Sequence, residues 1–169
     1  KLYFNLSTIA KGYGVDVVAD IIEGNQIGDY LVEIGGEMRV AGKKANGSDW
    51  RIAIEKPVSN ERAIQKIISI GNNAVATSGD YRNYFEQDGV RYSHLIEPTT
   101  GYPITHNLVS VTVVHASSMT ADGLATALHV LGAEKANELA HRNDLAVFMI
   151  MKQGEDFIDY TSPVFDRDI

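Results

Sequence analysis

Short strand-like runs separated by glycine, asparagine and proline turns fill the middle of the chain, and they constrain its fold more than any other feature. Three helical patterns accompany them: one ending at Gly24-Asn25, one ending at Gly132, and one over 134–142. Strands mixed with paired helices favour an α+β fold with a mixed, largely antiparallel sheet and packed helices. We predict strands over residues 2–6, 29–34, 37–41, 50–54, 63–70, 74–77, 90–96, 108–115 and 145–151, with a last hairpin after 152–155 that has Pro163 in its edge.

Two of these segments need interpretation. Residues 63–70 match a helical face as well as a strand alternation, and their β-branched side chains favour a strand. In the first helix, we expect Tyr13, Val17, Val18 and Ile21 to form the buried face. At the start of that helix, Thr8 and Lys11 are candidates for an anion site, although from these residues alone a capping hydroxyl and a solvated lysine are the favoured explanation.

Composition excludes several classes of function. The chain has 169 residues, of which 44% are hydrophobic, and this predicts one domain over residues 1–169. Its net charge of −7, without a run of basic residues, argues against nucleic acid or an anionic membrane surface as the partner. The absence of cysteine excludes disulfides and thiolate metal sites. Because the sequence starts at Lys1 rather than Met and enters a strand-like run at once, we expect it to be a segment from within a longer protein.

The segment 119–128 is the strongest candidate for chemistry. Leu124, Ala127, Leu128 and Leu131 have the spacing of an apolar helix face, Ser117, Ser118 and Thr120 are possible N-caps, and Gly132 is a possible stop. Asp122 and Thr126 lie four residues apart, so their oxygens share one side of the helix. Such a pair suits Mg²⁺ bound together with a phosphate. The alternative is that Asp122 interacts with the helix dipole and Thr126 bonds the preceding turn.

Other residues are ambiguous by themselves. His94 follows a strand-like run beside an acidic turn, where it would serve either as a general base or as a hydrogen-bonded structural residue. Gly35-Gly36 allows a turn with positive φ or the close approach of a ligand, and the turn is a sufficient explanation.

Five segments considered together change this picture. In order and spacing they resemble the signature blocks of the ApbE family, the FAD:protein FMN transferases once described as thiamine-biosynthesis lipoproteins. The segments are Ile9-Ala10-Lys11-Gly12-Tyr13, Ile34-Gly35-Gly36-Glu37, Thr77-Ser78-Gly79-Asp80-Tyr81, the run from Ser93 to Gly101, and Ala121-Asp122-Gly123-Leu124-Ala125-Thr126-Ala127.

The resemblance implies a reaction that moves the FMN half of FAD to a Thr or Ser hydroxyl of an acceptor flavoprotein and releases AMP. It implies that catalysis uses His94, as the base, and Asp122. The residues implied as Mg²⁺ ligands are Thr8, Asp122, Ala125 and Thr126, and those implied to contact FAD are Lys11, Gly35, Gly36, Ser78, Gly79, Asp80 and Ile96.

The chain departs from the family pattern at two positions. Glu97 stands where an Asp is usual, which shifts that carboxylate by about 1 Å. Gly123 replaces an Ala, which costs the helix up to about 1 kcal/mol and leaves both ligand positions intact.

Alternative functions remain open at this point: an Mg²⁺-dependent FAD pyrophosphatase that uses water, or a non-catalytic flavin-binding module. The resemblance also implies that this chain is the C-terminal half to two-thirds of a longer protein. It implies a periplasmic enzyme whose full-length form is lipid-anchored at the inner membrane, with no membrane contact from this part of it.

Overall fold

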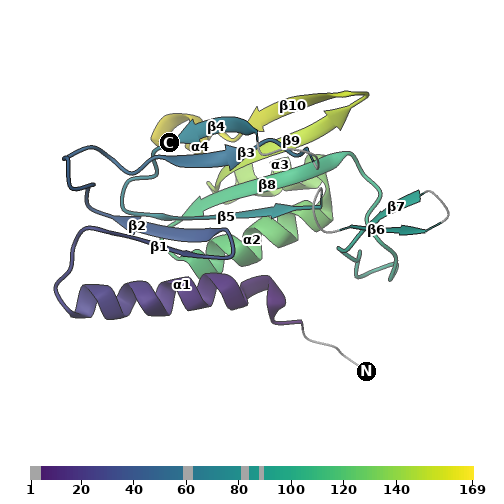
Figure 1. Ribbon diagram of the computed structural model, residues 1–169. Helices are drawn as coiled ribbons and strands as arrows, with labels where there is room; N and C mark the ends of the chain where they lie inside the picture. Colours follow the sequence, from purple (N-terminus) through teal and green to yellow (C-terminus); the bar gives the residue numbers. More distant parts are fainter. Residues whose placement is uncertain (1–4, 59–62, 81–83, 88–89) are drawn as a thin grey trace.

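The computed structural model describes residues 5–58, 63–80, 84–87 and 90–169. The first and last elements of the chain are helices, and the strands lie between them in the sequence (Figure 1). They are α1 (Ser7–Gly24), β1 (Tyr30–Ile34), β2 (Glu37–Ala41), β3 (Ile52–Glu55), β4 (Ile64–Ile68), β5 (Ala74–Gly79), β6 (Tyr84–Gln87), β7 (Val90–Ser93), β8 (Leu108–His115), α2 (Ser118–Leu131), α3 (Ala133–Arg142), β9 (Ala146–Gln153), β10 (Asp156–Thr161) and α4 (Pro163–Asp168).

The main sheet has six strands in the order β1-β2-β5-β8-β9-β10, and each pairing within it is antiparallel. The pairs β3–β4 and β6–β7 form separate two-stranded sheets, which are also antiparallel. This confirms the predicted α+β class with a largely antiparallel sheet, and it confirms a strand rather than a helix at residues 64–68.

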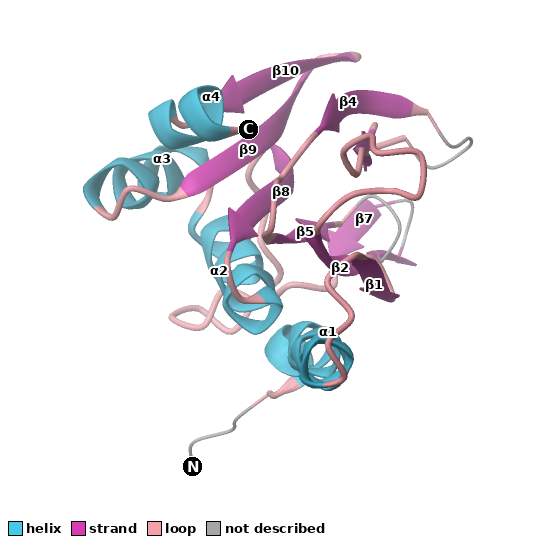
Figure 2. Ribbon diagram, turned by 90° about the vertical axis from the view of Figure 1, so that its left-hand side faces the viewer, coloured by secondary structure: helices cyan, strands magenta, loops and turns pink. Residues whose placement is uncertain are grey.

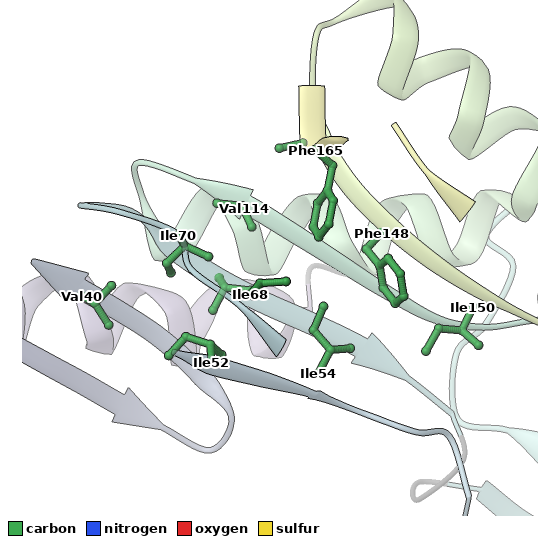
Figure 3. Close-up of a cluster of buried hydrophobic side chains, with 11 residues drawn as sticks. Val40, Ile52, Ile54, Ile68, Ile70, Val114, Phe148, Ile150 and Phe165 are labelled. Atoms are coloured by element: carbon green, nitrogen blue, oxygen red, sulfur yellow. The ribbon is translucent and has the colours of Figure 1, made fainter. Parts of the chain in front are cut away.

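Strand alternation sends apolar side chains to both faces of the main sheet. In β8 and β9, Val111, Val113, Val147 and Met149 pack with α2 and α3 on one face. On the other face, Val114, Phe148 and Ile150 pack with β3, β4 and α4, a cluster that also contains Ile52, Ile54, Ile68 and Phe165 (Figure 3). The sheet therefore has a hydrophobic core on each side, and burying one such large apolar side chain is worth roughly 1.5–3 kcal/mol.

Helix α1 lies against α2 and the β1–β2 hairpin, at the end of the molecule opposite β10 (Figures 1 and 2). The predicted buried face of this helix is wrong, because Tyr13 and Ile21 are 58% and 60% exposed, and Val17 and Val18 are exposed too. The residues that are buried are Gly12, Val15 and Ala19. Gly12 allows α1 to lie close to the start of α2, and Val15 and Ala19 pack against Tyr30 and Val32 of β1.

Other boundaries also differ from the predictions. Residues 1–4, where most of the expected first strand falls, lie outside the described residues, and α1 already begins at Ser7. Pro163 is not in a strand edge but is the first residue of α4, after the N-cap Ser162, where its missing N–H costs nothing. On α2, Leu128 is buried as expected, whereas Leu131 is 42% exposed and Ala127 is exposed as well.

Candidate active site

A cavity of about 640 Å³ lies where the start of α1, the middle of α2, the end of β5 and the segment after β7 meet. Most residues that line it are polar or small. They are Asn5, Ser7, Thr8, Lys11, Glu37, Thr77, Ser78, Gly79, His94, Leu95, Ile96, Pro98, Asp122, Thr126 and Val130.

Asp122 lies at the wall of this cavity and is only 5% exposed. Its Oδ2 accepts a hydrogen bond of 3.0 Å from the backbone N–H of Gly12 in α1. Burial raises the pKa of the Asp122 carboxyl, and the Gly12 N–H and the charge of Lys11 oppose that shift. The carboxylate is thus fixed in direction by one oxygen, while the side chain still borders the cavity.

The other predicted metal ligands divide into two groups. Thr8 and Thr126 line the same cavity as Asp122, and the Thr8 hydroxyl donates to the backbone oxygen of Asn5 at 3.2 Å. Ala125 is 1% exposed and packs in the core between α2 and the sheet, so its carbonyl oxygen is the one atom with which it could bind a cation.

Lys11 and Glu37 form an ion pair beside Asp122. The Lys11 Nζ lies 2.8 Å from the carboxylate of Glu37, which is 2% exposed. Burial raises the pKa of Glu37, the Lys11 ammonium opposes that shift, and the nearby Asp122 carboxylate adds to it. Two buried carboxylates therefore share the neighbourhood of one ammonium group, a distribution of charge that favours a further cation.

Gly35 and Gly36 form the turn between β1 and β2, with φ of +59° and +102°. Both values lie in the region that glycine tolerates best, as the sequence predicted. These residues do not line the first cavity. They border a second one, of about 800 Å³, which extends over β3 and shares Lys11, Glu37, Thr77 and Gly79 with the first.

His94 and Ile96 lie on the segment that follows β7, and both line the first cavity. Glu97, on the same segment, does not line the cavity. Its carboxylate accepts hydrogen bonds from the backbone N–H and the hydroxyl of Thr99. These bonds from Thr99 lower the pKa of Glu97. The extra methylene of Glu97 is therefore accommodated within its own turn, outside the wall of the cavity.

The three residues at the end of β5 have different surroundings. Ser78 and Gly79 line the first cavity. Asp80 is absent from both cavity walls and lies near His94, His106 and Ser93, where burial raises the pKa of its carboxyl and these three neighbours oppose the shift. Of the residues predicted to contact FAD, Asp80 is thus separated from the cavities that the others border.

The lining residues offer one class of ligand chemistry. A carboxylate, two threonine hydroxyls and an ammonium group suit a hard divalent cation next to a phosphate. Within the described residues, no three or more His, Asp or Glu side chains form a cluster that could hold a metal ion, so a cation bound here would depend on hydroxyl, carbonyl or phosphate oxygens for its remaining ligands. In the same part of the chain, none of the helices has the length and hydropathy needed to cross a membrane.

Comparison with known proteins identifies the family. The ApbE family model matches residues 1–149. The chain belongs to the ApbE family. It is 58% identical over 165 residues to the FAD:protein FMN transferase of Vibrio cholerae, an alignment that covers 98% of this chain and 49% of that protein.

Solved structures agree with this membership. The flavin transferase ApbE from Vibrio cholerae has a TM-score of 0.88 at 54% identity, covering 99% of this chain and 53% of the other. The apo form of the Pseudomonas stutzeri flavinyl transferase ApbE has a TM-score of 0.87 at 47% identity, with coverages of 99% and 52%. The chain thus spans about half the length of the ApbE relatives that it matches.

Two buried residues beside the cavity could not be assigned from the sequence. Glu37, in one of the five blocks, has no recognisable role in the sequence because its partner Lys11 lies 26 residues away. His129, in α2, contacts Ser78 behind the cavity wall. A signal for His129 was present, because Asp122, Thr126 and His129 have the i, i+4, i+7 spacing of one helix face.

Proposed function

We propose that the protein to which this chain belongs transfers FMN from FAD to a Thr or Ser hydroxyl of an acceptor protein, releases AMP, and requires Mg²⁺. The acceptor oxygen forms a bond to the phosphorus of the FMN half, the bond between that phosphorus and the bridging oxygen of the pyrophosphate breaks, and AMP carries the bridging oxygen away. The hydroxyl proton goes to a base.

One observation carries this proposal. The oxygens of Asp122, Thr126 and Thr8 and the ammonium of Lys11 border a single cavity of about 640 Å³. A reaction at a pyrophosphate needs positioning and stabilisation of charge more than it needs a nucleophile on the enzyme. Together with the names of the relatives, these donors favour group transfer from a dinucleotide.

The donor set fits Mg²⁺. Asp122 uses Oδ2 for the Gly12 N–H, and its Oδ1 would be the ligand to the cation, with Thr126 and Thr8 lining the same cavity. The carbonyl of Ala125, which does not line that cavity, would be the remaining protein ligand. When bound, Mg²⁺ would supply neutralisation of the charge that develops on the phosphate oxygens.

The other roles belong to side chains of the chain itself. Lys11, held by Glu37 at 2.8 Å, would bind a phosphate oxygen at the point where the two cavities meet. His94, at the rim of the first cavity, would accept the proton of the acceptor hydroxyl. Ser78, Gly79 and Ile96 would border the flavin, with Gly35 and Gly36 at the second cavity.

The test uses the full-length protein with FAD and Mg²⁺, with and without an acceptor protein that carries the Thr or Ser site. AMP together with a mass increase of one FMN on the acceptor is the expected result. AMP with free FMN, whether or not the acceptor is present, would instead establish a pyrophosphatase. FAD binding without AMP at any Mg²⁺ concentration would indicate a non-catalytic flavin-binding module. A periplasmic location and a lipid anchor stay predictions.

A further inference from the structure

His129 is the most deeply buried polar group next to the cavity that the reaction scheme does not use. Its side chain, on the sheet-facing side of α2, has 0% exposure. Its two ring nitrogens each have a partner, the backbone oxygen of Leu108 at 3.0 Å from Nε2 and the hydroxyl of Ser78 at 3.0 Å from Nδ1.

These two contacts determine where the ring proton lies. A carbonyl oxygen can only accept, so Nε2 must carry a hydrogen. Burial lowers the pKa of His129 to about 4, the backbone of Leu108 and of Ser78 opposes that shift, and the nearby imidazoles of His106 and His94 add to it, so the ring is neutral near pH 7. A neutral ring with its hydrogen on Nε2 has a bare Nδ1, which accepts.

The direction of the Ser78 hydroxyl follows from this tautomer. Ser78 must donate its single hydrogen to Nδ1 of His129, and Ser78 itself lines the cavity. A hydroxyl in a cavity wall ordinarily rotates to donate or to accept as its ligand requires. The Ser78 hydroxyl cannot rotate in this way, because its hydrogen is bonded to Nδ1 of His129 and therefore points away from the ligand.

We propose that His129 fixes the polarity of Ser78, so that Ser78 offers the cavity only lone pairs and selects a ligand group that is a fixed hydrogen-bond donor. Phosphate oxygens are acceptors, and a rotating ribityl hydroxyl can satisfy either polarity. FAD has two fixed donor groups, the imide N–H of the oxidised flavin ring and the amino group of adenine, and we assign the imide to Ser78 because Ser78 stands on the flavin side in the proposed function. His129 is thus a positioning residue that acts through Ser78 on recognition of the flavin ring, and the inference rests on the proposed function.

The test compares the affinities of FAD and of N3-methyl FAD, which lacks the imide hydrogen, for the full-length protein. The variants are Ser78→Ala, His129→Leu and His129→Gln. The Gln amide can donate to Leu108 and accept from Ser78, so it mimics the neutral ring. One neutral hydrogen bond predicts that wild type and His129→Gln prefer FAD by about 3- to 10-fold more than Ser78→Ala and His129→Leu do.

Ratios of the two dissociation constants that are equal in all four proteins would overturn the inference, even if FMN transfer were intact. A wild type that binds neither flavin would overturn both the inference and the proposed function. Nitrogen-15 NMR of His129 gives a readout that does not depend on flavin binding. We expect a neutral ring protonated at Nε2, with an Nδ1 resonance that shifts in Ser78→Ala, and a proton found on Nδ1 would contradict the proposal. His129→Gln and Ser78→Ala keep the test decisive if His129→Leu fails to fold.

Discussion

At the scale of single residues, buried polar groups in contact with one another define the site. Asp122 is held by the Gly12 N–H, and Glu37 by Lys11. The sequence could predict that Asp122 and Thr126 share a side of α2, because that follows from helix geometry. It could not predict the pairing of Lys11 with Glu37, since tertiary structure alone brings α1 and β2 together.

Replacement of His94 tests its proposed role as the base. We expect His94→Ala to slow FMN transfer by roughly 10²- to 10⁴-fold, because the acceptor hydroxyl then loses its proton acceptor. Single-turnover rates of acceptor labelling would measure the effect, with His141→Ala, at the end of α3, as the control. A His94→Ala rate equal to that of His141→Ala would return His94 to a structural role.

The low pKa of His129 predicts a pH dependence of stability. The unfolded chain takes up a proton at His129 near pH 6.5, whereas the folded chain does so only at about 4. The free energy of unfolding therefore falls as the pH is lowered through this window, by up to about 3 kcal/mol from this residue. Urea denaturation at several pH values should show that the free energy of unfolding falls less with decreasing pH in His129→Gln than in wild type. Parallel curves for the two proteins would contradict the low pKa of His129.

Gly12 of α1 lies close to the backbone at the start of α2. A Cβ at this position would lie 2.3 Å from the backbone oxygen of Ser118, so the helices would have to separate. We expect Gly12→Ala to lower the free energy of unfolding by about 1–3 kcal/mol, measured by chemical denaturation. Gly24→Ala, where a Cβ meets nothing within 4 Å, is the matched control and should be neutral or slightly stabilising. Equal effects of the two substitutions would rule out the packing argument.

At the scale of elements, α1 caps α2. Asp16 of α1 accepts hydrogen bonds from the Ser117 hydroxyl at 2.8 Å and from the backbone N–H groups of Ser118 and Met119 at 2.9 and 3.0 Å. Within α2 itself, the Ser117 side chain accepts from the N–H of Thr120. The carboxylate of Asp16 thus sets the position of the helix that carries Asp122.

Asp16→Asn tests this cap. Burial alone would raise the pKa of Asp16, but hydrogen bonds from α2 together with Arg39 lower it. Its stabilising effect is therefore present above the unfolded pKa near 3.8 and is lost as the pH falls through the lower folded value. We expect Asp16→Asn to lower the free energy of unfolding by about 1–3 kcal/mol at pH 7, measured by thermal or urea denaturation. The amide nitrogen of Asn cannot accept the hydrogen bonds that the second carboxylate oxygen of Asp16 accepts.

Asp20→Asn is the control for that substitution. Asp20 also pairs with Arg39, at 3.0 Å, but it is 68% exposed and does not contact α2. An exposed pair contributes little to stability, so the control should change it by less than about 1 kcal/mol. A loss in Asp16→Asn no larger than in the control would contradict the capping role.

Strands were easier to predict than helix faces. Alternation of apolar residues located β8 at Leu108–His115 and the β1–β2 pair to within a residue. The face of α1 was assigned to its bulky residues, whereas Val15 and Ala19 make its contacts with β1. The pattern of bulk along a helix does not reveal which side a neighbouring backbone approaches. Helix α4 was missed because Pro163 was interpreted as a strand-edge residue.

At the scale of the whole molecule, the six-stranded sheet supports the candidate site, which lies at one end of the sheet. Segments from α1, β2, β5, the loop after β7 and α2 contribute to one cavity, although they are spread over most of the chain. The five blocks of the sequence that carry the family resemblance each contribute at least one residue to the two cavities. The fold therefore brings together segments that are far apart in the sequence.

The most direct test of this account is the Mg²⁺ dependence of FMN transfer in Asp122→Asn. The substitution keeps an oxygen for the Gly12 N–H and removes the charge, so we predict an intact fold by circular dichroism and loss of acceptor labelling at Mg²⁺ concentrations that saturate wild type. Asp49→Asn, at a carboxylate that is 68% exposed and pairs with Lys43, is the control and should label the acceptor normally. Wild-type labelling by a folded Asp122→Asn protein, with the same Mg²⁺ requirement, would contradict the central claim.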